Sequence, residues 1–315
     1  MTEIKKIQVP WTNVYGIART LLAVGTLITL LFNNTDTLFK PLGVEISKVA
    51  GSIFLTRLSI FSILSDKYLE LAKWLSIIIL LIVISGWRPR ISGILHWWVS
   101  FSFASSCIEI DGGDQVIANL SLFLLPVTLT DSRKWHWTKP DPITNTHHQV
   151  YALIAISAFL VIRFQVAIIY FQACVAKFRV EEWANGTALY YWFIHPTFGL
   201  PDWLKPLVMP MLTNSMIITF LTWSILVLEA MLFMGLFMEK KYRPHLLKLG
   251  LVFHFGIIIV HGLFSFSLAM TAALILYLRP IEKAFNLPLW VADWVKSLKT
   301  RFHFLSISKG EALVH

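Results

Sequence analysis

Three polar side chains recur at steps of seven residues near the middle of the chain: Arg163, Tyr170 and Lys177. They accompany an apolar stretch over 151–175 that is long enough to cross a bilayer. Seven residues at about 100° each return to within about 20° of the starting direction, so the three side chains share one face of a helix. A cationic face that spans roughly 21 Å is expensive in lipid. We therefore predict that this face contacts protein, water or a ligand.

Lys177 lies near the predicted outer end of this helix, beside an aromatic segment over 181–214. A partly desolvated lysine in that position could act as a general base or bind a substrate carboxylate. The alternative is a snorkelling lysine at a helix end, whose aliphatic chain lies against apolar surface while its ammonium group stays in the membrane interface. The spacing leaves both open, and it makes Trp183, Tyr190 and Tyr191 candidates for the wall of a cavity.

Glu229 is an acidic residue inside another predicted span, over 215–238. An unpaired charge at mid-membrane costs at least about 2.5–3.5 kcal/mol, so such a group is expected to pair or to function. Counting from the ends of the spans puts Glu229 and Arg163 at similar depth. We predict an internal ion pair between Glu229 and either Arg163 or Arg19.

His254 and His261 are also seven residues apart and share a helical face. They could relay protons, or bind a polar headgroup or a quinone carbonyl. Their separation, roughly 10 Å along the helix, is too large for one metal ion without further ligands, and we predict no metal site. His136 and the pair at 147–148 fall in a predicted loop, where we expect solvated side chains.

The sequence IDGGDQ, which contains Asp111 and Asp114, joins two predicted spans at the outer face. Its glycines permit a tight reversal, and its aspartates are expected to cap the next helix. The turn also brings two carboxylates to the side of the membrane where we expect Lys177.

The two cysteines, Cys107 and Cys174, lie in apolar segments outside any C-x-x-C motif. We predict two small buried side chains, with a disulfide between neighbouring helices as the alternative.

The composition is that of a membrane protein. Of 315 residues, 56% are hydrophobic and 14% are charged, whereas soluble domains carry about 25% charged residues. The mean hydropathy is +0.67. The net charge of +9 sits in short basic blocks between apolar segments, a pattern that orients membrane proteins and does not predict nucleic-acid binding. We therefore predict an all-α, polytopic membrane helix bundle.

Apolar stretches of about 17–25 residues mark the predicted spans. We expect about eight transmembrane helices, over 14–32, 69–86, 91–110, 114–130, 151–175, 215–238, 248–262 and 263–279. The last two form one apolar run interrupted at His261-Gly262, so a hairpin and a single broken helix are both open, and seven spans is the alternative. If all eight cross, the basic blocks fall on one side, which predicts that both termini are cytoplasmic. Residues 1–285 would form the transmembrane domain and 286–315 a basic amphipathic cytoplasmic tail.

A series of motifs in matching order resembles the sporulation-delaying protein B (SdpB) family. The motifs are TLLFNNTDTLF, GWRPRISGILHWW, IDGGDQ, LSLFLLPVTLTDSR, EEWANGTALYYWF with HPTFGLP after it, and HFGIIIVHGLFSFSLAM. The resemblance implies a multi-pass protein of a bacterial plasma membrane that is required for maturation of a secreted peptide toxin. It also implies two partners, a small protein similar to sporulation-delaying protein A and a signal-bearing toxin precursor.

Through that family the chain is similar to the HTTM group, whose domains resemble the transmembrane part of vitamin K-dependent γ-glutamyl carboxylase. Tyr170-Phe171, Lys177, Glu182-Trp183 and Gly186 resemble a carboxylase pattern. The resemblance implies that Lys177 stands where a base deprotonates reduced vitamin K, so a reduced quinone is the implied cofactor. The chain departs from the carboxylases in having no clean counterpart of their histidine and no large lumenal region.

Three functions therefore stay open. The chain could be a factor that binds a toxin precursor and enables its maturation, an enzyme of the carboxylase type that modifies a peptide with Lys177 as base and His254 and His261 as proton carriers, or an immunity or export factor.

Overall fold

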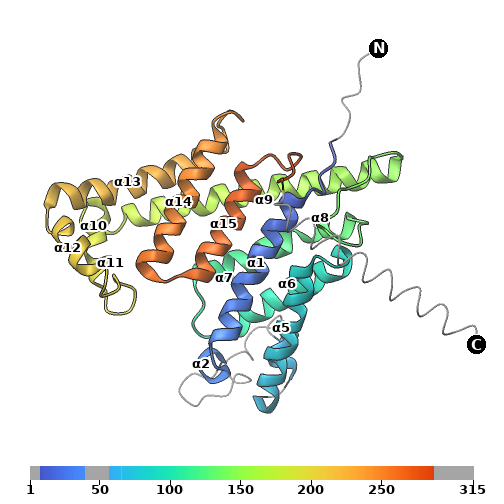
Figure 1. Ribbon diagram of the computed structural model, residues 1–315, viewed down its shortest axis with the longest axis horizontal. Coiled ribbons are helices and arrows are strands. Elements are labelled where there is room, and N and C mark those ends of the chain that lie inside the picture. The colour runs from blue at the N-terminus through green and yellow to red at the C-terminus, as the bar shows by residue number, and fades with distance from the viewer. Residues whose placement is uncertain (1–7, 40–56, 65, 287–315) are drawn as a thin grey trace, which may run out of the picture.

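The computed structural model describes residues 8–39, 57–64 and 66–286. These residues are largely helical, and an isolated β-bridge joins Trp87 to Trp135. Figure 1 shows the longer helices packed together, with α9 crossing most of the width of the bundle. In chain order the elements are α1 (Asn13–Phe32), α2 (Thr35–Phe39), α4 (Ile60–Ile63), the 3₁₀ turn η3 (Asp66–Tyr68), α5 (Leu69–Ser85), α6 (Pro89–Ser106), α7 (Gly112–Phe123), α8 (Leu125–Thr130), α9 (Thr146–Phe178), α10 (Glu181–Ala184), α11 (Ala188–Ile194), α12 (Lys205–Leu212), α13 (Ser215–Met234), α14 (Arg243–His261) and α15 (Phe264–Leu278).

Each of the eight predicted spans coincides with a helix, the fourth of them with α7 and α8 together. Five stretches of the described residues are long and apolar enough to cross a membrane: α1, α7 with α8, α9, α13 and α14. The all-helical fold and the membrane-spanning character are thus confirmed, while the count of eight and the side of the termini stay predictions. The predicted tail 286–315 lies outside the described residues, apart from its first residue.

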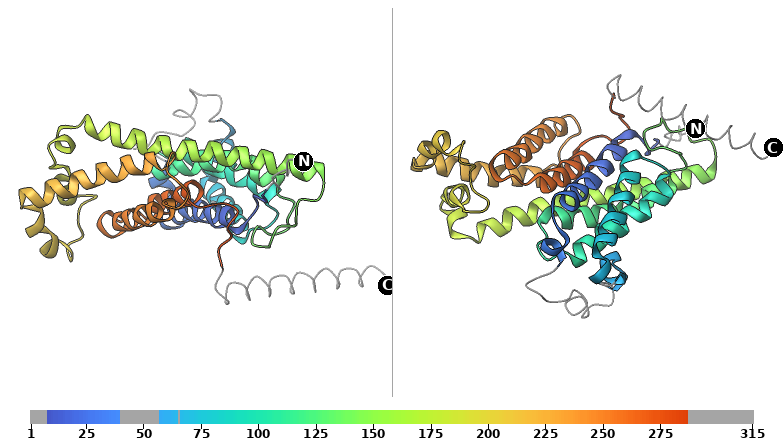
Figure 2. Two further views of the ribbon diagram at one scale, coloured as in Figure 1. Left: turned by 90° about the horizontal axis from the view of Figure 1, so that it is seen from above. Right: turned by 60° about the horizontal axis from the view of Figure 1, so that its bottom comes forward.

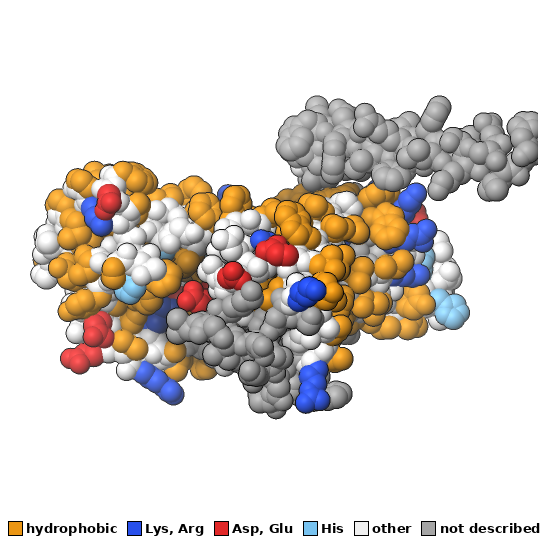
Figure 3. All heavy atoms as spheres, turned by 90° about the horizontal axis from the view of Figure 1, so that it is seen from below, with side chains coloured by type: hydrophobic (Ala, Val, Ile, Leu, Met, Phe, Trp, Pro, Cys, Tyr) orange, Lys and Arg blue, Asp and Glu red, His pale blue; other side chains and the backbone are white. Residues whose placement is uncertain are grey.

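The outer surface of the helices is apolar. Large hydrophobic side chains such as Phe220, Val252 and Phe255 are exposed, and Figure 3 shows hydrophobic atoms over much of one face. A water-soluble monomer rarely exposes a continuous apolar surface of this kind. Lipid is the solvent that suits these helices.

The apolar run over 248–279 forms a hairpin. Helix α14 ends at His261, Gly262 adopts a left-handed conformation with φ of 68°, and α15 begins at Phe264. The two helices pack against each other, and they lie side by side in Figures 1 and 2. The broken-helix alternative is therefore wrong, because a residue with positive φ, favourable for glycine, reverses the chain here.

The centre of the bundle is the contact between α1 and α15. On α1, Ala18 and Leu22 are four residues apart and fully buried. On α15, Ala269, Ala272 and Ala273 are fully buried too. Small side chains let two helix backbones approach closely, which is the usual way that membrane helices gain packing energy.

Helices α9 and α13 pack with a stagger. The N-terminal half of α9 extends past the end of α13, and the first turns of α13 extend past the end of α9. With 33 residues, α9 is about 50 Å long, well over the ~30 Å of a hydrocarbon core. Its C-terminal half packs against α13, as the contact between Phe171 and Phe233 shows, with ring centroids 5.0 Å apart. The first turns of α13 contact α11 and α12, which cluster with α10 at one end of the molecule.

The other end of the bundle is closed by a loop that follows α8. The amide of His136 donates to the carbonyl of Gly86 at 3.0 Å, and the amide of Arg88 donates to Lys134 at 2.7 Å. These bonds hold the loop against the bundle, so that the His136 side chain is fully buried. Its Nδ1 atom lies 3.5 Å from Nη1 of Arg19.

The expected solvation of His136 is therefore wrong, because the loop folds back over the start of α1. Burial, together with the positive charges of Arg19 and Arg133, lowers the pKa of His136 well below its ordinary value. The imidazole is a neutral, structural group. The histidines at 147 and 148 lie in the first turn of α9 rather than in a loop.

We predict that Gly86→Ala destabilises the protein by about 1–3 kcal/mol. Gly86 has φ of 82°, and an added Cβ would lie 2.5 Å from the His136 ring. The measurement is thermal unfolding of the full chain in detergent. Gly256→Ala is the matched control, because nothing lies within 4 Å of its added Cβ; equal melting temperatures for the two variants would contradict the prediction.

Candidate functional site

The candidate site begins with an ion pair at the end of α9. The Nζ atom of Lys177 lies 2.6 Å from Oε1 of Glu229 on α13, with side chains 26% and 6% exposed respectively. The same ammonium group lies 5.4 Å from the centre of the Trp183 ring, within the range of a cation–π interaction. Lys177 thus contacts protein partners on two elements instead of reaching freely to the interface.

The predicted pairing of Glu229 with Arg163 or Arg19 is wrong. Arg163 donates through Nε to the carbonyl of Tyr277 at 2.9 Å, one of the carbonyls in the last turn of α15 that lack a partner within the helix. Arg19 donates to Ser92 at 2.8 Å. The cause is the stagger of α9 and α13, which sets Glu229 opposite Lys177. Arg163 lies fourteen residues before Lys177, roughly 21 Å away along α9, so it is out of reach of Glu229.

Tyr170 belongs to the same neighbourhood as the ion pair. Its hydroxyl is hydrogen-bonded to Nε2 of His254 at 2.9 Å, between two buried side chains. Among the described residues, no hydrogen bond reaches Nδ1 of His254 or the second carboxylate oxygen of Glu229. Buried polar atoms nearly always have a partner, so these two atoms have hydrogen-bonding capacity that the described part of the protein does not use.

The two predicted site histidines do not come together. His254 points into the bundle toward Tyr170, whereas His261 lies at the end of α14 against the carbonyl of Phe198. Its ring is also 6.3 Å from the ring of Trp192. His261 therefore connects α14 to the aromatic segment, and its role as a proton carrier stays a prediction.

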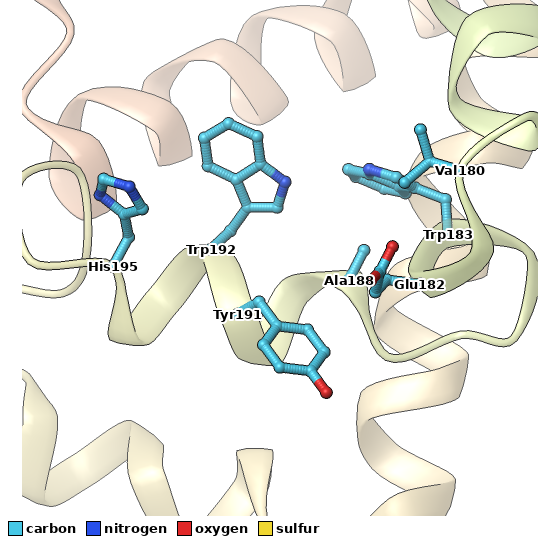
Figure 4. Close-up of a pocket in the computed structure, with 7 residues that line it drawn as sticks. All are labelled: Val180, Glu182, Trp183, Ala188, Tyr191, Trp192 and His195. Carbon is cyan, nitrogen blue, oxygen red and sulfur yellow. The ribbon is translucent and has the colours of Figure 1, made fainter.

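The aromatic segment forms a pocket of about 340 Å³ beside the ion pair. Figure 4 shows the indole rings of Trp183 and Trp192 on opposite sides of a shared space, with His195 beyond Trp192. Tyr191 lines the pocket, and Tyr190 packs against Tyr191 with ring centroids 5.5 Å apart without lining it. The lining residues are Val180, Glu182, Trp183, Ala188, Tyr191, Trp192 and His195.

Trp183 joins the pocket to the ion pair, since it lines the first and contacts Lys177 of the second. Sequence reasoning did not single out Trp192, His195 or Glu182 as site residues. Their signal is weak because Glu182 lies in α10, of four residues, and Trp192 in α11, of seven, with His195 directly after it; such short helices show no periodic pattern.

The remaining predicted site residues have structural roles. Asp111 and Asp114 form a reciprocal capping box at the start of α7: the carboxylate of Asp111 accepts from the amide of Asp114 at 2.9 Å, and the reverse bond is 3.2 Å. Neither aspartate bonds to the Lys177 cluster within the described ranges.

Both cysteines are free thiols, and Cys174 donates to the carbonyl of Leu226 at 3.6 Å. The disulfide alternative is therefore wrong. Across the described part of the chain, no group of three His, Cys, Asp or Glu residues has the geometry to hold a metal ion.

The fold and the site define a class: a helical integral membrane protein with a partly buried lysine–glutamate pair next to an aromatic pocket. The chain is 36% identical over 276 residues to the sporulation-delaying protein SdpB of Bacillus subtilis (strain 168), an alignment that covers 87% of this chain and 83% of that protein. It is 42% identical over 276 residues to the uncharacterised protein YitO of the same organism, with 87% of each chain covered. The protein belongs to the SdpB family. No family model and no solved structure matches it.

We predict that Lys177 and Glu229 are energetically coupled by about 1–3 kcal/mol, because removing one partner leaves the other charge buried. Lys177→Met and Glu229→Gln should each lower the unfolding temperature, and the double variant should lose less than the sum. The measurement is a double-mutant cycle by thermal unfolding in detergent.

The exposed pair of Lys205 and Asp202 provides the matched control for this cycle. Lys205→Met and Asp202→Asn should show no measurable coupling, since exposed ion pairs contribute little. Strict additivity at Lys177 and Glu229 would mean that their contact does not stabilise the bundle.

Proposed function

We propose that this protein is required for the production of a secreted peptide toxin of the sporulation-delaying type, and that its aromatic pocket binds the toxin precursor. The family relationship supports the pathway. The observation that carries the site is the double contact of Trp183, which lines the pocket and lies against the Lys177 ammonium group. A group bound in the pocket would therefore touch both an aromatic wall and the edge of a partly buried charge pair.

The chemistry of the pocket suits a peptide. Tryptophan and tyrosine bury large apolar areas while their N–H and O–H groups remain available for hydrogen bonds, which makes them frequent anchors for protein ligands. A volume of about 340 Å³ is at the low end for ligand pockets and fits a few side chains of an extended segment. Glu182 and His195 add polar groups to its lining.

The proposed partners follow from the same region. A precursor held in the bilayer by an apolar signal segment would reach the pocket from the lipid side, past exposed residues such as Tyr191 and Leu207. We propose that a small protein similar to sporulation-delaying protein A acts on the same precursor with this chain. We also propose a bacterial plasma membrane as the location, with both termini in the cytoplasm.

A second candidate is a peptide-modifying enzyme of the carboxylase type that uses a reduced quinone. The unpartnered atoms of His254 and Glu229 favour it, because they offer hydrogen-bonding positions within the bundle. A base at Lys177 fits less well. Its ammonium group already donates to the Glu229 carboxylate at 2.6 Å, so the group that would have to act as the base is engaged by a protein partner. An immunity or export role has no specific observation in its favour.

We expect Trp192→Ala and Lys177→Met to lower the yield of mature toxin by about tenfold or more, the loss that follows when a hot-spot contact of about 1.4 kcal/mol is removed. The host strain would lack its own copy of the gene and would carry each variant at equal membrane levels. Secreted peptide and cell-associated precursor are measured by mass spectrometry.

Trp203→Ala is the control, because Trp203 is an exposed tryptophan of the same segment that does not line the pocket. Normal toxin from both pocket variants would refute the proposed site. The intact mass of the mature peptide separates the two candidates: the precursor-binding role predicts no added group, whereas the enzyme predicts the mass of one carbon dioxide at each modified residue.

A further inference from the structure

A second cavity, of about 230 Å³, lies at the other end of the bundle. It forms where the turn before α6 meets the loop after α8, two segments joined by the bond from the Arg88 amide to Lys134. Its lining is Arg88, Arg90, Ile91, Asp131, Ser132, Arg133 and Lys134. Four of these seven side chains are cations, and one is an anion.

The anion is already neutralised. Asp131 forms an ion pair with Arg133 at 2.7 Å, and it also accepts a hydrogen bond from the Tyr15 hydroxyl. No ion pair engages the other three cations, Arg88, Arg90 and Lys134, within the part of the chain that the structure describes. The cavity therefore has a surplus of positive charge and donor groups.

Arg88 is held in a conformation that costs energy. Its φ is 38°, and no other non-glycine residue among those described has a positive φ. Such a backbone costs of the order of 1–3 kcal/mol and persists where the surroundings impose it. Here the imposing contacts are the backbone hydrogen bonds between the turn and the loop, which fix the Arg88 backbone at the cavity that its side chain lines.

An apolar groove of about 460 Å³ lies between α8 and α9, and the contact of Arg90 with Tyr151 links it to this cavity. Pro126 of α8 forms one wall, and residues of the N-terminal half of α9 form the other. The guanidinium group of Arg90 lies 5.9 Å from the centre of the Tyr151 ring, and Tyr151 neighbours Val150 in the groove wall. The groove residues are Pro126, Val150, Leu153, Ile154, Ser157, Ala158 and Val161.

We infer that these two cavities together bind one anionic phospholipid, with its phosphate among Arg88, Arg90 and Lys134 and an acyl chain along α9. Guanidinium groups bind phosphate oxygens through paired, charge-assisted hydrogen bonds. The groove is lined mainly by aliphatic side chains. Such a surface suits an acyl chain, whereas a free phosphate ion would make no favourable contact with it. Basic pockets next to membrane helices are a known form of headgroup recognition. This site is separate from the aromatic pocket and does not depend on the proposed toxin function.

The test is native mass spectrometry of the full chain in detergent, titrated with phosphatidylglycerol or with phosphatidylcholine of the same acyl chains. We expect a saturable first phosphatidylglycerol molecule. The double variant Arg88→Gln with Arg90→Gln should bind it roughly tenfold more weakly, since two charged donors are lost. The matched control is Lys139→Gln with Lys240→Gln, which removes two exposed charges outside the cavity and should leave binding unchanged.

The groove is tested independently by Ser157→Trp, which places an indole in the acyl position, against Leu160→Trp on an exposed part of the same helix. We expect only the first to weaken binding. Competition with inorganic phosphate distinguishes the source of the phosphate group. Displacement of the lipid by millimolar phosphate with no effect of Ser157→Trp would assign the cavity to a free phosphate, and equal binding of both lipids in all variants would overturn the site altogether.

Discussion

The ion pair between Lys177 and Glu229 is the contact on which the pocket end of the molecule depends. A charge in a helix that faces lipid must find a partner, and each of these residues is the partner of the other at 2.6 Å. The pair can form at one register of α9 against α13 only, because a shift by one turn of about 5.4 Å would leave both charges without their contact. The aliphatic faces of the two helices specify no such register by themselves, since lipid tails are as apolar as the side chains.

That register explains why the chain can build a pocket at the end of α9. With Glu229 opposite Lys177, the first turns of α13 extend past the end of α9 and provide a wall for α11 and α12. The carbonyls and amides of these short elements cannot be left bare in lipid, and covering them with protein is what makes irregular backbone tolerable there. Gly186, with φ of 85° and Thr219 of α13 close to it, shows how tightly the turn before α11 follows α13.

The sequence predicts the helices well, because apolar length is a direct consequence of bilayer thickness. It also predicts that Tyr170 and Lys177 face the same way, which the 3.6-residue period dictates. It does not predict the partner of Glu229, because depth counted along separate spans ignores the stagger between them. His136 was assigned to solvent for a similar reason: nothing in its neighbours signals that the loop folds back onto Gly86. Contacts between distant segments are the part of the site that periodicity cannot supply.

Arg163 and Lys177, the two cations on the polar face of α9, therefore have different roles. Arg163 satisfies a helix carbonyl of α15 and needs no carboxylate, so its charge stabilises a helix end. The Lys177 ammonium group contacts both the Glu229 carboxylate and the Trp183 ring. That ring also lines the pocket. A ligand that displaces or stacks on Trp183 must change the surroundings of the ammonium group, and a carboxylate or carbonyl oxygen that approaches it must compete with Glu229. The wall of the pocket and the contact that sets the register of α9 against α13 are therefore joined through one side chain, that of Lys177, which lies between Trp183 and Glu229.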